Sequence, residues 1–457
     1  YINMQILKIV FINRAPFGNL ELDFEEYGIN VLSAINGKGK TTILSQIADA
    51  FHEMAKVTYD NSYSGDFKKK YYRVVTSRYS LDIKEPALVY IRFAHNNEMY
   101  DYIELAGNID EEGYNQINII DKIPYSKILI KLQESANTKI LSSNSTRNNI
   151  NSIFGTSILT YFPAYRFEVP GFLNNSYSDK ILYDISPKYS GYLTNPIEVV
   201  SDLPQLANWL MDLVLDWSLY KDEKSLQLRQ ALNQLLSLAL ETKTKTNVRL
   251  GIGQRNDSST RISVVYDNGE IIYPSIFEIS SGEAALLCLF GEILHQSDRI
   301  GQTLNCEGIV LIDEIDKHLH ITLQYNILPK LFNLFPKIQF IVSSHSPFLT
   351  MGLGEMQQHR AKLIDLDNNG LITVPRNTEL YKSVYNLFVS ENNNFAKELA
   401  TVKEKIAEQT KPIVITEGKT DIKHILKAKE MFSITDLKFA CIEVCKQPDG
   451  DMNYFLY

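Results

Sequence analysis

The hydrophobic pattern changes its period several times along the chain, and each change predicts a different element. Apolar and polar residues alternate over residues 4–11, 20–24 and 29–32, which predicts three short strands. A glycine-rich turn follows, and residues 41–54 then show helical spacing. The amino-terminal part therefore predicts the order strand, glycine loop, helix.

The middle of the chain divides into a polar part and a leucine-rich part. Residues 58–151 are rich in tyrosine and asparagine, with β-like runs at 88–93 and 102–105, which predicts an insertion carrying its own small sheet. Leucine recurs at helical spacing over residues 203–240, which predicts two amphipathic helices packed on the rest of the protein.

A second α/β block follows the leucine-rich part. Expected strands at residues 261–266, 308–312 and 339–342 alternate with helical segments, as in a mainly parallel sheet. A polar helical segment, 383–408, then leads to a last strand at 413–416. The fold class that we expect is α/β.

The composition is that of a globular protein and does not identify its partners. Hydrophobic residues make up 44% and charged residues 22% of the 457 residues, as in an ordinary globular protein. The apolar runs are shorter than the roughly 20 residues of a spanning helix, and no secretory leader opens the sequence, so we expect a cytoplasmic protein without membrane contact. The four cysteines lack zinc-ligand spacing and are expected to be reduced.

Charge leaves nucleic-acid binding open. The net charge of −8 argues against a broadly basic surface, but it does not exclude a local groove for phosphates. Residues 68–73 mix lysine, arginine and tyrosine, which fits either a nucleic-acid contact or a solvated face.

The glycine loop carries the strongest chemical signal. Residues 34–41 match G-x-x-x-x-G-K-[ST] between a strand and a helix, except that Ala34 replaces the first glycine. Backbone N–H groups of such a loop can surround phosphates, the Lys40 ammonium can reach the β and γ oxygens, and the Thr41 hydroxyl can ligate Mg²⁺. A chance glycine–lysine turn that caps a helix is the alternative.

Three further groups fit the same chemistry. Asp313 and Glu314 end an apolar strand, where the first can hold Mg²⁺ through water and the second can polarise an attacking water. Residues 280–283 open a helix whose N–H groups suit an anion. His345 ends another strand and can donate to a phosphate oxygen, although a structural role is the commoner one for a lone histidine.

The order and spacing of these motifs resemble the ATP-binding-cassette (ABC) ATPases of the structural-maintenance-of-chromosomes and RecF type, over residues 1–370. The resemblance implies a Walker A loop, a variant signature in which Ser281 replaces a glycine, a Walker B pair, a D-loop and a switch histidine. It also implies a head-to-head dimer that clamps two ATP molecules. The nucleotide-binding residues implied are Asn36, Gly37, Lys38, Gly39, Lys40, Thr41, Thr42, Ser280, Ser281, Gly282, Glu283 and Asp316; Thr41 and Asp313 are the implied metal ligands, and Glu314 and His345 are the implied catalytic residues.

Residues 161–166, which end in Arg166, resemble a strand-end arginine motif of related heads. Arg166 can reach phosphate or DNA, but we expect a structural salt bridge. The glutamine of the family's Q-loop has no assignment.

The carboxyl-terminal part adds a second motif. Residues 413–416 lead into Glu417, Gly418 and, four residues after Glu417, Asp421, which resembles the E-G-x-x-D motif of Toprim domains. Behind a cassette ATPase this resembles the OLD (overcoming lysogenization defect) family of defence nucleases, including retron-associated members, and implies that Glu417 and Asp421 are catalytic metal ligands. A Toprim domain also needs a later D-x-D, but residues 446–448 rather than an apolar strand precede Asp449 and Asp451.

The resemblance gives a domain plan and a function. The plan is ATPase lobe I with a β-rich insertion (1–165), a helical insertion (166–250), lobe II (251–375), a helical linker (376–410) and an incomplete Toprim-like segment (411–457). The leading interpretation is an ATPase with ATP and Mg²⁺ as cofactors that controls metal-dependent DNA cleavage in anti-phage defence. Two alternatives remain: an ATP-dependent sensor or scaffold that holds a separate effector or nucleic-acid partner without cutting, and a RecF-like DNA-repair clamp. The expected partners are a second copy of the chain and DNA, with a retron reverse transcriptase, its msDNA or a separate effector protein as further candidates.

Overall fold

The structure is a computed structural model. It describes residues 4–35, 37–60, 79–135, 137–166, 191–200, 203–244, 246–253, 261–407, 413–416, 419–434, 440–446 and 452–456. These residues form two compact units, residues 1–381 and 382–457.

A six-stranded sheet forms the centre of the first unit, in the order β14-β13-β3-β12-β11-β7. Neighbouring strands are parallel except at the β13–β14 edge. The expected strands at 29–32, 308–312 and 339–342 are confirmed as three of its members. The six strands are β3 (Ile29–Ser33), β7 (Ile158–Phe162), β11 (Gly308–Ile312), β12 (Ile338–Ser344), β13 (Ala361–Asp365) and β14 (Leu371–Thr373).

Both faces of this sheet are covered, because successive side chains of a strand point to opposite faces. On β11, Ile309 and Leu311 belong to one apolar cluster, whereas Val310 and Ile312 belong to another. All five residues of the strand are buried. The uninterrupted apolar sequence of β11 is therefore explained by burial on two sides.

An antiparallel five-stranded sheet lies on one side, in the order β2-β1-β4-β5-β6. Its β4 pairs directly with β1, so the expectation that residues 58–151 carry their own small sheet is wrong. Pairing between distant segments is a tertiary property that alternation within a strand does not encode. The strands are β1 (Gln5–Arg14), β2 (Phe17–Asp23), β4 (Ala87–His95), β5 (Glu98–Ala106) and β6 (Asn137–Leu141), and the short helices that follow β5 and β6 are α2 (Glu111–Asn115), α3 (Tyr125–Glu134) and α4 (Arg147–Thr156).

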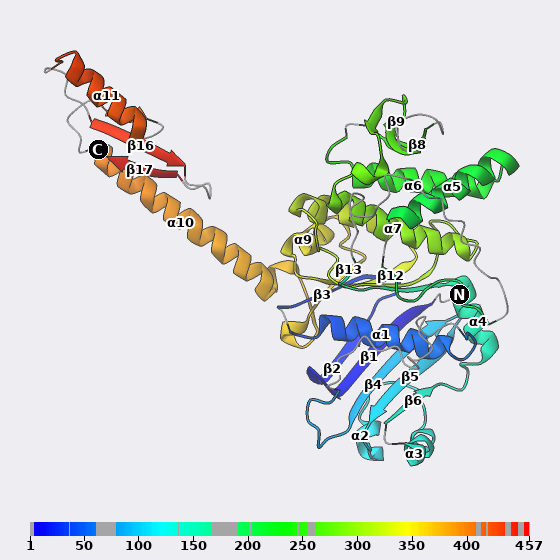
Figure 1. Cartoon of the computed structure of the whole chain (residues 1–457). Helices are drawn as coiled ribbons and strands as arrows, with labels where there is room; N and C mark the ends of the chain where they lie inside the picture. The colour runs from blue at the N-terminus through cyan, green and yellow to red at the C-terminus, as the bar shows by residue number, and fades with distance from the viewer. Residues whose placement is uncertain are drawn as a thin grey trace. The chain divides into compact units, whose positions relative to one another are not determined.

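Helix α1 (Lys40–Ala55) packs between the two sheets. Its apolar side chains, among them Ile43, Leu44 and Ile47, share one cluster with Ile9 of β1 and Leu311 of β11. Figure 1 shows α1 running alongside the strands of the five-stranded sheet. The packing holds the start of α1 at the carboxyl end of the central sheet.

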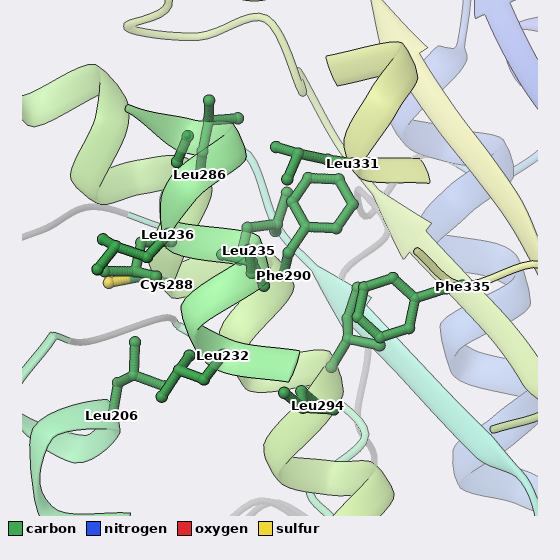
Figure 2. Close-up of a cluster of buried hydrophobic side chains, with 14 of the residues drawn as sticks. Leu206, Leu232, Leu235, Leu236, Leu286, Cys288, Phe290, Leu294, Leu331 and Phe335 are labelled. Carbon is green, nitrogen blue, oxygen red and sulfur yellow. The ribbon is translucent and has the colours of Figure 1, made fainter. Parts of the chain in front are cut away.

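Helices cover the opposite face of the central sheet. The expected leucine-rich pair is confirmed as α5 (Leu203–Tyr220) and α6 (Glu223–Ala239), which pack with α7 (Ser281–Arg299). Leu232, Leu235 and Leu236 of α6 share one buried cluster with Phe290 of α7, and Figure 2 draws these side chains. The two further helices of this layer are α8 (Leu328–Asn333), which follows a short π-helical segment, Leu323–Ile327, and α9 (Pro347–Met356).

A three-stranded antiparallel sheet projects from this helical layer, in the order β10-β9-β8. Its strands are β8 (Val248–Ile252), β9 (Ile262–Tyr266) and β10 (Ile271–Tyr273). The strand expected at 261–266 therefore exists, but its assignment to the parallel sheet is wrong. A five-residue apolar strand has the same pattern in either setting.

The second unit contains a strand–helix–strand arrangement. Strand β15 (Ile413–Thr416) leads to α11 (Lys419–Met431) and is parallel to β16 (Ala440–Lys446), which pairs antiparallel with β17 (Met452–Leu456). Helix α10 (Glu379–Ala407) precedes these strands along the chain. The expectation that no apolar strand comes before Asp449 is wrong, because β16 ends three residues earlier. None of the described helices has the length and apolar character needed to cross a membrane.

Candidate nucleotide-binding site

The glycine loop joins β3 to α1, as the sequence predicts. Gly37 and Gly39 have φ angles of +82° and +86°, a region that side chains disfavour. A Cβ atom on Gly39 would lie 2.3 Å from the Phe17 ring and 2.7 Å from Pro16, whereas nothing lies within 4 Å of one on Gly37. Gly39 is thus required both by its backbone angle and by the β1–β2 turn that packs against it.

Lys40 folds back over the loop. Its ammonium donates to the carbonyl oxygens of Ala34 at 2.7 Å and Ile35 at 3.1 Å, and only 6% of the residue is exposed. Burial lowers the pKa of Lys40, and the carboxylates of Asp367 and Asp313 are foremost among the charges that oppose this shift. The cation is therefore held inside the loop, where an anionic ligand would be favourable.

Asp313 lies at the centre of the site and is fully buried. Its Oδ2 accepts a hydrogen bond from the Thr41 hydroxyl at 2.8 Å, and its Oδ1 accepts one from the Ser343 hydroxyl. A buried carboxylate needs such donors to offset its lost hydration. The hydroxyl and carboxylate oxygens also form a donor set that suits Mg²⁺, so the residues fit the metal that the sequence predicts.

Glu314 follows β11 in a left-handed backbone conformation. Its φ of +46° is left-handed, and its backbone N–H donates to the Ser343 hydroxyl at 2.7 Å. The side chain is 39% exposed, with Oε2 at 4.0 Å from the Lys317 ammonium. The backbone is anchored while the carboxylate faces solvent, as a base that acts on water requires.

Asp316 and His345 meet through the backbone. The N–H of His345, just after β12, donates to Asp316 Oδ1 at 3.2 Å. The structure therefore brings together the residues expected as D-loop and switch histidine, at the same sheet edge as Asp313.

Arg166 has a different partner from the one expected. Its guanidinium donates to the main-chain carbonyl oxygens of Pro163, Asp313 and Glu314. Among the described residues these carbonyl oxygens, rather than a carboxylate, are its hydrogen-bond partners, so the expected salt bridge is not found there. Burial lowers the pKa of Arg166 to about 10, against the attraction of Asp313. Arg166 is thus a clamp on the turn that carries the two acidic residues.

The residues at the start of α7 form a separate group. Ser280 is exposed, and its hydroxyl donates to Glu283, which is 2% exposed. Glu283 also accepts a hydrogen bond from the Lys243 ammonium at 2.7 Å. A Cβ on Gly282 would lie 3.1 Å from the His318 carbonyl oxygen, so the helix start packs tightly on the segment after Asp316. These described contacts of Ser280 and Glu283 do not include the glycine loop.

Several predicted residues lie outside the described part of the chain or in the second unit. Asn36, Glu417, Asp449 and Asp451 lie outside the described residues. Asp421 is exposed in the first turn of α11. Within the ranges that the structure describes, no three His, Cys, Asp or Glu side chains are grouped to hold a metal ion.

Three residues of the site were not predicted from the sequence. Ser343 supports Asp313 and Glu314, Lys243 pairs with Glu283, and Asp367 contacts the glycine loop. A serine at the end of a buried strand was a usable signal for Ser343. Lys243 and Asp367 have no comparable local signal, because only the fold brings them to their partners.

Comparisons with known proteins show the family to which the chain is similar. A family model described as "AAA domain, putative AbiEii toxin, Type IV TA system" matches residues 35–351. The chain is 45% identical over 92 residues to the Retron Vc95 probable ATPase of Vibrio cholerae serotype O1 biovar El Tor, which is 19% of this chain and 17% of that protein. It is 40% identical over 81 residues to the Septu protein PtuA of Bacillus mycoides (strain KBAB4), which is 18% of this chain and 11% of that protein.

The matched stretches thus span less than a fifth of these curated relatives. Among solved structures, the SMC head domain from Thermotoga maritima is 14% identical with a TM-score of 0.38, covering 76% of this chain and 92% of that one. The recombination mediator protein RecF is 13% identical with a TM-score of 0.35, covering 81% and 98%.

Proposed function

We propose that this chain, which belongs to the AAA-domain family matched over residues 35–351, binds ATP with Mg²⁺ and hydrolyses it between two copies of its own head. One observation carries the proposal. Thr41 and Asp313, which lie 272 positions apart in sequence, share a hydrogen bond beside a buried Lys40. An oxygen pair next to a cation in a glycine loop is the arrangement that a metal-bound triphosphate requires.

Each side chain has one physical task in this proposal. The loop amides and Lys40 bind the phosphates, and Thr41 and Asp313 hold the Mg²⁺ that neutralises developing charge. Glu314 accepts a proton from the attacking water, and its exposed carboxylate supports this role. Asp316 and His345 complete the γ-phosphate end, supported by the hydrogen bond between them.

We propose that a second copy of the chain supplies the remaining residues of each nucleotide site. The exposed Ser280 and Ser281 open a helix whose N–H groups suit an anion, yet their described contacts are not with the glycine loop of the same chain. We propose that they close over the triphosphate of a partner, as in ABC-type heads. The isologous dimer then contains two equivalent sites.

Two substitutions test the ATPase. Lys40→Ala should lose nucleotide binding, while Glu314→Gln should keep binding but slow hydrolysis by at least about a hundredfold and trap the ATP-bound dimer, since the base is gone. The measurements are nucleotide binding, the rate of phosphate release, and dimer formation, the last by light scattering.

Matched controls come from the opposite edge of the sheet. Lys337 and Glu307 form a partly exposed ion pair just before β12 and β11. Lys337→Ala and Glu307→Gln should behave as the unaltered protein. Undiminished turnover by Glu314→Gln would contradict its role as the base.

For the second unit, we propose a Toprim-type, metal-dependent nuclease activity under control of the ATPase. Its support is that β15 ends at Thr416 and α11 begins at Lys419 with Asp421 in its first turn, so that the sequence of the motif falls at a strand-to-helix connection. DNA incubated with Mg²⁺ or Mn²⁺ should be cut by the unaltered chain but not by Glu417→Ala. Equal cutting by both, or by neither, would remove the nuclease and favour a scaffold that holds a separate effector.

We also propose a role in anti-phage defence, supported by the partial likeness to retron probable ATPases and PtuA. DNA, a retron reverse transcriptase and its msDNA are the proposed partners. A RecF-like repair clamp is the remaining alternative, and it has no evident use for Glu417 and Asp421.

A further inference from the structure

A carboxylate contacts the glycine loop from outside the motif. Asp367 Oδ2 accepts a hydrogen bond from the Ile35 N–H at 3.1 Å, and Oδ1 lies 3.9 Å from the Lys38 ammonium. The side chain is only 10% exposed, and Oδ1 accepts no hydrogen bond from a described residue. A negative charge therefore lies in the region where phosphate is expected.

The fold places this carboxylate there by strand register. Strand β13 is parallel to β3, with Asp365 beside Ser33. Two residues further along each strand, Asp367 faces Ile35. Because both positions follow the carboxyl ends of adjacent central strands, no loop movement is needed to bring them together.

The turn that holds Asp367 is tied by several contacts. The Asp365 carboxylate accepts hydrogen bonds from the Asp367 N–H at 3.0 Å and from the Asn368 amide at 2.7 Å. Gly370 has a φ of +79°, and a Cβ there would lie 2.5 Å from Leu22 of β2. Withdrawal of Asp367 from the loop would therefore disturb several fixed contacts.

The electrostatic consequence opposes nucleotide binding. A polyphosphate is strongly anionic, so a fixed carboxylate beside its loop repels it, and burial limits screening by solvent. The same carboxylate attracts Lys38, which the resemblance assigns to the nucleotide, and it is foremost among the charges acting on Lys40.

We propose that Asp367 is a built-in competitor for nucleotide phosphate, which engages Lys38 and the Ile35 amide and sets a weak affinity for ATP and ADP. The inference rests on the proposed nucleotide site and deepens it. The site would then bind ATP and ADP more weakly than the glycine loop would without Asp367. Weaker binding favours rapid exchange of ADP for ATP.

The test replaces the charge and keeps the shape. Asp367→Asn should tighten ATP binding by about tenfold, measured by titration calorimetry in EDTA, where hydrolysis does not proceed. The gain should grow from AMP to ADP to ATP, and added salt should reduce it. Asp367→Ser, which also removes the charge, should show the same trend, and Glu307→Gln is the control for one lost negative charge.

The outcomes distinguish failure of the role proposed for Asp367 from failure of the proposed nucleotide site. If Asp367→Asn and Asp367→Ser bind ATP no more tightly than the unaltered chain, or gain equally for AMP and ATP, the competitor role is overturned. If Lys40→Ala binds ATP as well as the unaltered chain, the nucleotide site itself is overturned. If Lys40→Ala loses ATP binding but the two Asp367 variants bind ATP as the unaltered chain does, the proposed nucleotide site stands and only the role of Asp367 is rejected.

Discussion

At the scale of single residues, Ser343 links two acidic groups that act in different ways. Its hydroxyl donates to the buried Asp313 carboxylate and accepts from the backbone N–H of Glu314. One side chain therefore orients the proposed metal ligand and fixes the left-handed turn of the proposed base. Neighbouring Ser344, by contrast, accepts from the Ser346 N–H at 2.9 Å and does not take part in these contacts.

Ser343→Ala should lower the ATP hydrolysis rate by at least about tenfold, because Asp313 and Glu314 lose their shared anchor. The free energy of unfolding should fall by about 1–3 kcal/mol, the cost of buried groups left without a partner. Ser344→Ala is the matched control, with a comparable loss of stability and near-normal hydrolysis. Equal hydrolysis rates for the two variants would contradict this account of Ser343.

At the scale of elements, the glycine loop depends on the hairpin that precedes it. Strands β1 and β2 bring Pro16 and Phe17 against Gly39, and α1 starts at the next residue. The loop is thus supported by the β1–β2 turn on one side and by the packed helix α1 on the other. Gly37 shares the left-handed backbone but faces open space.

This difference gives a paired prediction. Gly37→Ala should cost about 1 kcal/mol of unfolding free energy from its positive φ alone. Gly39→Ala should cost more, about 2–4 kcal/mol, because the new Cβ must also displace Phe17 and Pro16. Denaturant titration measures both, and ATP binding should be lost in the second. A smaller effect at Gly39 than at Gly37 would show that the hairpin does not brace the loop.

At the scale of the whole molecule, the two halves of the proposed site occupy different parts of one chain. Lys40 lies between the sheets, whereas Ser280 lies at the start of the helical layer and is tied to Glu283. In a twofold dimer, the glycine loop of each chain would face the start of α7 of its partner, so that two complete sites form.

Mixing two inactive variants tests this arrangement. Lys40→Ala and Ser280→Ala should each hydrolyse ATP poorly, since each impairs both sites of its own dimer. After subunit exchange, half of the dimers should be mixed, and each of these contains one intact site. The mixture should therefore recover about a quarter of the activity. A mixture as inactive as its parents, with exchange verified by affinity tags, would argue against a shared site.

Much of the candidate site could be predicted from sequence because its signals are local. The glycine loop, the Asp313–Glu314 pair and the start of α7 each lie within eight consecutive residues at the end of a strand or the start of a helix. Their backbone geometry follows from neighbouring residues. The strands and helices that carry them are confirmed for the same reason, since apolar spacing reports the period of one element.

The sequence by itself determined the strand, glycine loop and helix at the start of the chain, the leucine-rich helix pair and the strands that precede Asp313 and His345. Only the tertiary structure decided which strands pair. Strand β4 pairs with β1, and β9 belongs to the small antiparallel sheet rather than to the parallel one. It also decided the partners of Arg166, Ser343, Lys243 and Asp367. The physical reason is that register between distant strands and the sharing of buried hydrogen bonds depend on the whole packed core, which no local pattern encodes.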